Sequence, residues 1–272
     1  MTTTKIAILG AGNMGTSLLG GLIANHYSPK NIFVTDTDSH KLEQLQKQFQ
    51  VQTSTDNKTA VQNAEVVILA VKPQTIASVT KEIAPAIQQK KPLVISIAAG
   101  VRANSLQKIL GENIPIVRCM PNTPALIGCG ASALFANTQV SPEQRDLAES
   151  ILRAVSVIVW LDDEKQMDAI TALSGCGPAY FFLVMESLQS AAEKMGLSAD
   201  VARLLTQQTA LGAARMALES EFSVAQLRQK VASPGGSTER ALQVLEDGKI
   251  RDLFAKALFA AKTRSEELAE TF

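Results

Sequence analysis

Short apolar runs alternate with amphipathic stretches along the N-terminal part of the chain. Continuous apolar runs are typical of strands in a parallel sheet whose two faces are both covered by helices. The pattern therefore predicts an α/β fold, a doubly wound sheet of the Rossmann type. The predicted strands are 5–9, 31–35, a short one from 51, 65–71, 92–97, 115–118, 131–135 and 155–161, and the predicted helices between them are 14–24, 38–48, one from 73 and 142–154.

Past about residue 162 the strand pattern stops and only helical periodicity remains. We therefore predict two domains, a dinucleotide-binding Rossmann domain at 1–162 and an all-helical substrate-binding and dimerisation domain at 163–272. Apolar residues such as Phe181 and Leu188 cover much of one helix, which predicts that this helix is central and buried. So apolar a helix in so small a domain favours a homodimer, with a monomeric helical core as the alternative. The predicted helices are 164–173, 178–195, 199–219, 223–231, 237–245 and 249–271.

Composition narrows the classes of function. Lys and Arg together number 26, as do Asp and Glu, so the zero net charge argues against nucleic acid or an anionic membrane as the partner. Three cysteines and two histidines without metal-ligand spacing argue against a metal site. No apolar run approaches the roughly 20 residues of a membrane span, and the N-terminus lacks the pattern of a signal peptide. We therefore expect a cytoplasmic protein.

A glycine motif stands where the first predicted strand meets the first predicted helix. Gly10-Ala-Gly-Asn-Met-Gly15 has the G-x-G-x-x-G spacing, whose glycines allow a tight turn and the close approach of a pyrophosphate. Asp36, followed by Thr37, lies at the end of the second strand, where an acid binds the adenosine ribose. This acid favours NADH over a coenzyme with a 2′-phosphate, although Asp is also common as a helix cap or turn residue.

Two further glycine-containing stretches suit ligands. Ala98-Ala99-Gly100 follows a buried strand, and ligands of open α/β sheets bind at such carboxyl ends. Ser233-Pro-Gly-Gly-Ser-Thr238 separates two helical patterns, with Ser237 and Thr238 as cap residues of the second. Bare N–H groups and the helix dipole there suit a small anion. An ordinary turn between helices is the plainer interpretation of the same residues.

Four stretches together resemble one family. The motifs of pyrroline-5-carboxylate reductase are similar, in order and spacing over the whole chain, to Gly10–Gly15, Val117-Arg-Cys-Met-Pro-Asn-Thr-Pro-Ala125, Ala172-Leu-Ser-Gly-Cys-Gly-Pro-Ala-Tyr180 and Val231–Thr238. The resemblance implies hydride transfer from NADPH or NADH to the C=N carbon of 1-pyrroline-5-carboxylate, which gives L-proline. It also implies a homodimer, and because family members assemble into rings of five dimers, a pentamer of dimers stays open.

The resemblance implies roles for individual residues as well. The hydroxyl of Thr238 would contact the ring nitrogen, and the N–H groups of Gly236, Ser237 and Thr238 would hold the substrate carboxylate. Glu221 would relay a proton through water, with a solvated helix end as the plainer interpretation. The substrate pocket would also include Ser174, Gly175, Cys176, Gly177, Ser233 and Gly235. The coenzyme would be contacted by Gly10, Gly12, Asn13, Met14, Gly15, Asp36, Thr37, Asn57, Ala70, Val71, Lys72, Pro73, Ala98, Ala99, Gly100, Pro121 and Asn122.

Two positions depart from the family pattern. Cys176 replaces a serine, which keeps the size but weakens hydrogen bonding, and no nearby histidine makes it a nucleophile. Asp36 stands where many NADPH-preferring members have arginine or a small polar loop, so we expect NADH use at least comparable with NADPH use.

Two other classes of protein are alternatives to the reductase. A β-hydroxyacid dehydrogenase needs a lysine that the helix after Gly177 lacks until Lys194, and a regulatory nucleotide-binding module would not need the 233–238 loop.

Overall fold

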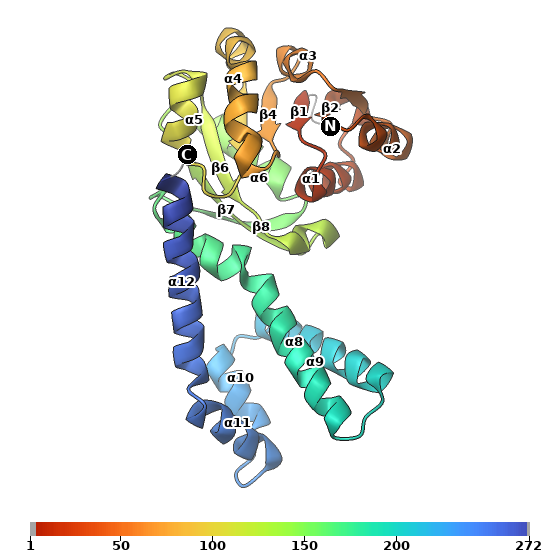
Figure 1. Ribbon diagram of the computed structural model, residues 1–272, viewed down its shortest axis with the longest axis vertical. Coiled ribbons are helices and arrows are strands. Elements are labelled where there is room, and N and C mark those ends of the chain that lie inside the picture. The colour runs from red at the N-terminus through yellow and green to blue at the C-terminus, as the bar shows by residue number, and fades with distance from the viewer. Residues whose placement is uncertain (1–3, 271–272) are drawn as a thin grey trace. The chain divides into compact units, whose positions relative to one another are not determined.

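The computed structural model describes residues 4–270, which pack into two compact units (Figure 1). Unit 1 contains the chain up to Cys176 together with the residues from Ala261 onward, and unit 2 contains Gly177–Ala260. The domain boundary at 162/163 stays a prediction. The compact units divide the chain elsewhere, because residues 163–176 and 261–270 belong to unit 1.

Unit 1 is built on an eight-stranded sheet. Its strands are β1 (Ile6–Leu9), β2 (Ile32–Thr35), β3 (Gln52–Ser54), β4 (Val66–Leu69), β5 (Leu93–Ser96), β6 (Ile116–Met120), β7 (Gly130–Ala136) and β8 (Ser156–Trp160). They lie in the order β3-β2-β1-β4-β5-β6-β7-β8, which confirms the predicted Rossmann-type sheet. Among the described strands, β6 and β7 form the single antiparallel pair, and because β8 lies parallel to β7, both β7 and β8 run opposite to the other six. Strands β6 and β7 are joined through the 3₁₀ helix η2 (Thr123–Ile127), and this connection is too short for a parallel crossover.

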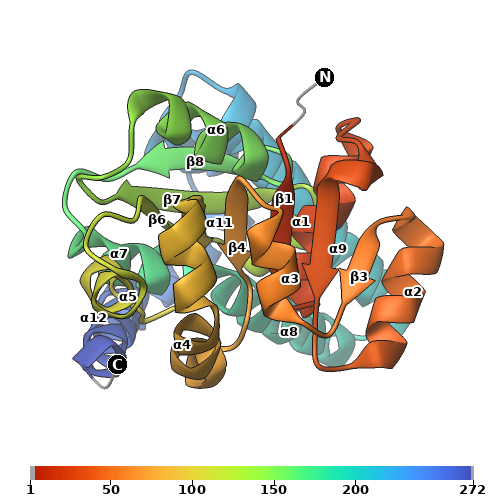
Figure 2. The same ribbon diagram turned by 90° about the horizontal axis from the view of Figure 1, so that it is seen from above.

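Helices cover both faces of this sheet (Figure 2). They are α1 (Asn13–Ala24), α2 (Ser39–Phe49), α3 (Asn57–Gln62), α4 (Pro73–Lys90), α5 (Ala103–Leu110) and α6 (Pro142–Leu152), with the 3₁₀ turn η1 (Pro29–Asn31) before β2. Alternate residues of a strand point to opposite faces. Ile6 and Ile8 therefore join the core under α1, α2 and α6, whereas Ala7 and Leu9 join the core under α3, α4 and α5. Burial on both faces explains the continuous apolar runs.

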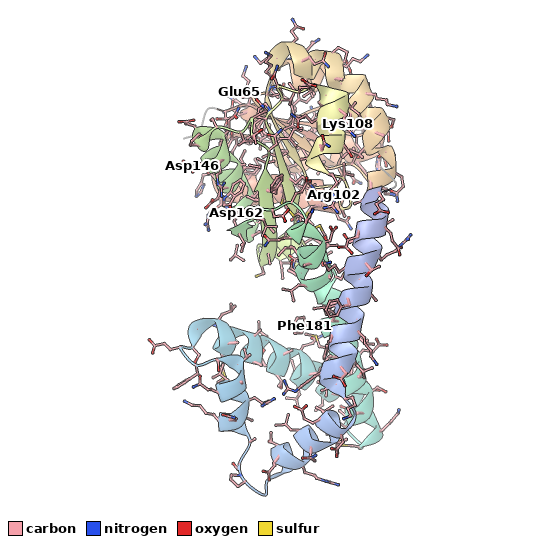
Figure 3. All side chains as sticks on the ribbon, turned by 90° about the vertical axis from the view of Figure 1, so that its left-hand side faces the viewer. Glu65, Arg102, Lys108, Asp146, Asp162 and Phe181 are labelled. Atoms are coloured by element: carbon pink, nitrogen blue, oxygen red, sulfur yellow. The ribbon has the colours of Figure 1, made fainter. Side chains whose placement is uncertain are left out.

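Unit 2 is helical. It contains α8 (Gly177–Lys194), α9 (Ala199–Glu219), α10 (Val224–Val231), α11 (Ser237–Asp247) and the first part of α12 (Ile250–Glu270), and α8 packs along α9. Phe181, Phe182 and Leu183 are nevertheless 68%, 63% and 62% exposed, and Figure 3 labels Phe181. The prediction of a buried central helix is therefore wrong for a single chain, because these apolar side chains meet solvent instead of a core inside unit 2.

The helical stretch Gln166–Lys194 joins three elements without a break. They are α7 (Gln166–Ile170), the π-helical turn η3 (Thr171–Gly175) and α8. The stretch is long and apolar enough to cross a membrane by length and composition, which corrects the expectation that no segment approaches that length. Only 22% of its most apolar window is buried. Length and composition alone are a weak sign of a membrane span, because core helices of soluble proteins meet the same criteria.

Candidate coenzyme and substrate sites

The first glycine motif forms the turn between β1 and α1. Gly10 has a φ of +111°, and a Cβ there would lie 2.6 Å from the carbonyl oxygen of Ala70. A Cβ on Gly15 would lie 2.2 Å from the carbonyl oxygen of Gly10, so both positions require glycine. Gly12 differs, because no atom lies within 4 Å of its Cβ position. It leaves open the space that a pyrophosphate needs to approach the backbone.

The start of α1 presents unpaired backbone donors. Gly12 is its N-cap, no side chain caps the helix, and no acidic residue lies in the first turn. The first N–H groups of a helix have no intrahelical acceptor and carry the positive end of the helix dipole. Asn13, which is exposed, and the half-buried Met14 belong to this turn. These residues fit the phosphates of a dinucleotide coenzyme.

Asp36 lies beside this turn, at the end of β2. Its Oδ2 accepts a hydrogen bond from the N–H of Ala11 at 2.7 Å, and its Oδ1 accepts one from the N–H of Asp38 at 3.0 Å. Asp36 therefore acts as a turn residue, which is one of the alternatives that the sequence left open for it. The helix cap of α2 is Asp38. The Asp36 carboxylate stays half-buried, and each oxygen keeps a lone pair for a ribose hydroxyl. Thr37, the next residue, is exposed.

The carboxyl ends of β4, β5 and β6 bring further predicted coenzyme residues to the same edge of the sheet. Ala70, Val71 and Lys72 lead from β4 to Pro73, the first residue of α4. Ala98–Gly100 follow β5, and Gly100 has a φ of +74°, a conformation that favours glycine. Pro121 and Asn122 follow β6.

Two asparagines predicted to touch the coenzyme are engaged by groups of the protein. Asn57 accepts a hydrogen bond from the Thr35 hydroxyl at 2.6 Å and donates one to Glu82 at 3.2 Å. Asn122 donates from Nδ2 to the carbonyl oxygen of Ser174 at 3.1 Å and accepts from the N–H of Ala131 at 2.9 Å. Asn122 thus fastens η3 to the sheet, and its contact with the coenzyme stays a prediction.

The motif Ala172–Tyr180 overlaps the π-helical turn η3 and the start of α8. The N–H of Cys176 donates to the carbonyl oxygen of Thr171 at 2.8 Å, and turns of this kind are frequent at functional sites. A Cβ on Gly175 would lie 2.5 Å from Met120 Cε, so glycine allows η3 to approach β6. The chain passes from unit 1 into unit 2 between Cys176 and Gly177.

The Ser233–Thr238 loop joins α10 to α11. Gly235 has a φ of +71°, and its N–H donates to Oε2 of Glu239 at 2.7 Å. The N–H of Gly236 donates to the carbonyl oxygen of Ser233 at 3.0 Å, so this donor is already engaged in the turn. Gly236 is also the N-cap of α11, a role that the sequence assigned to Ser237 and Thr238. Those two residues instead form the first turn, where backbone N–H groups lack intrahelical acceptors. Glu221 is exposed between α9 and α10.

Unit 1 also contains a buried ion-pair network that no motif in the sequence indicates. Asp168, 2% exposed, accepts from Nη2 of Arg102 at 2.7 Å and from the Ser265 hydroxyl at 2.8 Å. Arg118, 5% exposed, donates to Glu164 at 2.6 Å. Burial lowers the pKa of Arg118, and the hydrogen bond to Glu164 opposes that shift. The partners lie 46 to 97 positions apart in sequence, so no local pattern connects them.

Comparisons with known proteins cover both units. Residues 164–268 match the family described as "Pyrroline-5-carboxylate reductase dimerisation", and residues 5–100 match "NADP oxidoreductase coenzyme F420-dependent". The chain is 48% identical to pyrroline-5-carboxylate reductase of Pseudomonas aeruginosa, over 99% of this chain and 98% of that protein.

Two solved structures are similar over nearly the whole chain. A pyrroline-5-carboxylate reductase from Coxiella burnetii is 51% identical with a TM-score of 0.94, covering 98% of this chain and 99% of that one. Pyrroline carboxylate reductase of Plasmodium falciparum with NADP bound is 31% identical with a TM-score of 0.88, covering 99% of each chain.

Proposed function

The chain belongs to the pyrroline-5-carboxylate reductase family, and on that premise we propose how its own residues hold the coenzyme and the substrate. It is an NAD(P)H-dependent oxidoreductase of proline biosynthesis. The observation that carries this conclusion is the 48% identity over 99% of the chain. A match of that extent sets aside both the β-hydroxyacid dehydrogenase and the regulatory module without turnover.

The glycine turn of unit 1 holds the coenzyme in this proposal. The open space at Gly12 and the bare first turn of α1 receive the pyrophosphate. Asp36 receives the adenosine ribose, and Ala98–Gly100 border the nicotinamide. The bound nicotinamide supplies a hydride, two electrons with one hydrogen nucleus, to the C=N carbon of 1-pyrroline-5-carboxylate.

The Ser233–Thr238 loop of unit 2 holds the substrate. The N–H groups of Ser237 and Thr238 at the start of α11 suit the substrate carboxylate, where the helix dipole adds to the attraction. The Thr238 hydroxyl accepts from the protonated ring nitrogen, which keeps its proton and becomes a neutral secondary amine on reduction. Because a protonated imine is already electrophilic, the residues mainly have to align it, and alignment alone can lower a barrier by several kcal/mol.

Asp36 sets the coenzyme preference in this proposal. With 1-pyrroline-5-carboxylate present, we expect kcat/KM for NADH to equal or exceed that for NADPH, measured in parallel by loss of coenzyme absorbance. Asp36→Ser should raise the NADPH to NADH ratio about tenfold, because ~1.4 kcal/mol of repulsion between the carboxylate and a 2′-phosphate corresponds to that factor.

Glu43→Ser removes an exposed acid from α2 and is the matched control, for which the ratio should not change. Wild-type enzyme that works much faster with NADPH would contradict the role of Asp36 and leave the reaction intact. Absence of turnover with either coenzyme would contradict the proposed function.

We also infer that the chain forms a homodimer through unit 2. The match to a dimerisation family supports this, as do the large exposed apolar side chains of α8 and α9, since extensive apolar patches mark interfaces. Analytical sedimentation should give a molecular mass of at least two chains. A mass of ten chains would indicate the ring of five dimers. Phe181→Asp should shift the protein toward monomer, whereas Ser190→Asp, at an exposed polar position of α8, should not. A monomeric wild type would contradict the proposal.

The family is one of soluble metabolic enzymes, and the cytoplasm stays our proposal for this chain.

A further inference from the structure

The chain passes between the two compact units twice, after Cys176 and after Ala260. Both crossings are fastened inside unit 1 at one buried carboxylate. Asp168 in α7 precedes the first crossing, and Ser265 in α12 follows the second. The Ser265 hydroxyl donates to Oδ1 of Asp168 at 2.8 Å, and the two residues are only 6% and 2% exposed. One hydrogen bond therefore joins the two helices, α7 and α12, through which the chain leaves unit 1 and returns to it.

The other oxygen of Asp168 fastens the start of α5. Oδ2 accepts from Nη2 of Arg102 at 2.7 Å, and Arg102 is the N-cap residue of α5. Glu164 adds to the same anchor, since its Oε1 accepts from the N–H of Ala103 at 2.7 Å. Arg102 comes directly after the segment 98–101, so the network fixes the C-terminal end of the segment that follows β5.

The end of α12 also packs against this segment. A Cβ at Gly100 would lie 3.5 Å from the Cβ of Leu268, and Ala269 is 9% exposed. Gly100 therefore brings the backbone of the segment close to the last turns of α12. The helix that carries Ser265 therefore also lies against Gly100, one of the residues that border the nicotinamide in the proposed function.

We propose that Asp168, Arg102 and Ser265 are positioning residues for hydride transfer. They fix the start of α5, directly after the segment Ala98–Gly100, to α7 and α12 within unit 1, and they act through the backbone that they hold. This inference rests on the proposed function, in which that segment borders the nicotinamide. A buried carboxylate whose oxygens are all satisfied suits this role, because any arrangement that leaves it unpaired is costly. Small errors in alignment slow transfer strongly, by up to about a hundredfold for a displacement of ~1 Å.

The test removes the hydrogen bond and leaves the ion pair in place. Ser265→Ala should lower kcat with 1-pyrroline-5-carboxylate about tenfold and raise the primary deuterium isotope effect from C4-deuterated NADH, because transfer becomes slower than the other steps. The NADH dissociation constant, measured by coenzyme fluorescence, should stay at its wild-type value since Gly10–Gly15 are untouched. In the coenzyme-free protein, amide hydrogen exchange should quicken in 97–103 and 261–268. Ser265→Thr, which keeps the hydroxyl, should restore all of these properties.

Arg264→Gln is the matched control, because Arg264 and Glu267 form an exposed pair on the same helix. It should change neither the isotope effect nor the exchange. A Ser265→Ala protein that loses thermal stability but keeps wild-type kcat, isotope effect and local exchange would overturn the inference. An inactive wild type would contradict the proposed function instead, and the exchange measurement, which needs no substrate, would still decide on the anchor.

Discussion

Replacing Gly12 with alanine is expected to weaken coenzyme binding roughly a hundredfold, ~2.7 kcal/mol, without destabilising the fold. The backbone at Gly12 has φ −75° and ψ 179°, which alanine adopts readily. Its Cβ would meet no atom of the protein within 4 Å. The added methyl group therefore costs the folded chain little, but it fills the space that the pyrophosphate needs. Fluorescence titration with NADH measures the affinity, and thermal unfolding measures the stability.

Two other glycines provide the controls for this variant. Gly20→Ala lies in α1 with its Cβ 3.8 Å from the Phe49 ring, so affinity and stability should match or slightly exceed those of the wild type. Gly15→Ala should lose both, because its Cβ would lie 2.2 Å from a backbone oxygen. Gly12→Ala protein that binds NADH as tightly as wild type would contradict the placement of the pyrophosphate at this turn.

Thr238→Ala is expected to lower kcat/KM for 1-pyrroline-5-carboxylate by about a hundredfold, ~2.7 kcal/mol at the transition state. Thr238 is half-buried in the first turn of α11, and its hydroxyl is the proposed partner of the ring nitrogen. Hydrogen bonds to charged groups are worth about 1.5–3 kcal/mol, which sets the size of the expected loss. Steady-state kinetics at saturating coenzyme measures the change, with NADH affinity as the readout that should stay constant.

Two substitutions separate the hydroxyl from the shape of the side chain. Thr238→Ser keeps the hydroxyl and should retain most activity, whereas Thr238→Val keeps the shape and should behave like the alanine variant. Wild-type kcat/KM in the valine variant would show that the Thr238 hydroxyl has no part in the reaction.

Most of the fold of unit 1 could be predicted from local sequence patterns. Strands β1, β4 and β5 coincide with apolar runs, because a strand buried on both faces has little choice of residue type. The edge strand β3 is polar, and its residues carry no such signal. The glycine turn could be predicted as well. Gly10 and Gly15 have no room for a Cβ, so the turn requires the glycines that form the motif. The direction of β7 was not predicted, because it depends on the short connection through η2 and not on the strand's own residues.

Features that depend on residues far apart in the sequence could not be predicted from local patterns. The apolar pattern of α8 predicts that the helix is covered, but it does not distinguish a cover from the same chain from a cover by a second copy, and α8 is exposed in the single chain. The link from Asp168 to Ser265 spans 97 positions and joins residue types that are ordinary on any surface. The engagement of the Gly236 N–H in its own turn follows from backbone geometry, which the composition of the loop leaves open.

The central claim is that this chain reduces 1-pyrroline-5-carboxylate with a nicotinamide coenzyme, and the most direct test follows the transferred hydrogen. The purified protein would be given 1-pyrroline-5-carboxylate and NADH deuterated at both C4 positions, and the product would be identified by mass spectrometry and NMR. The account predicts one L-proline per coenzyme oxidised, carrying one deuterium on the ring carbon that was the imine carbon. Folded protein that binds NADH but forms no proline, or forms proline without that deuterium, would contradict it.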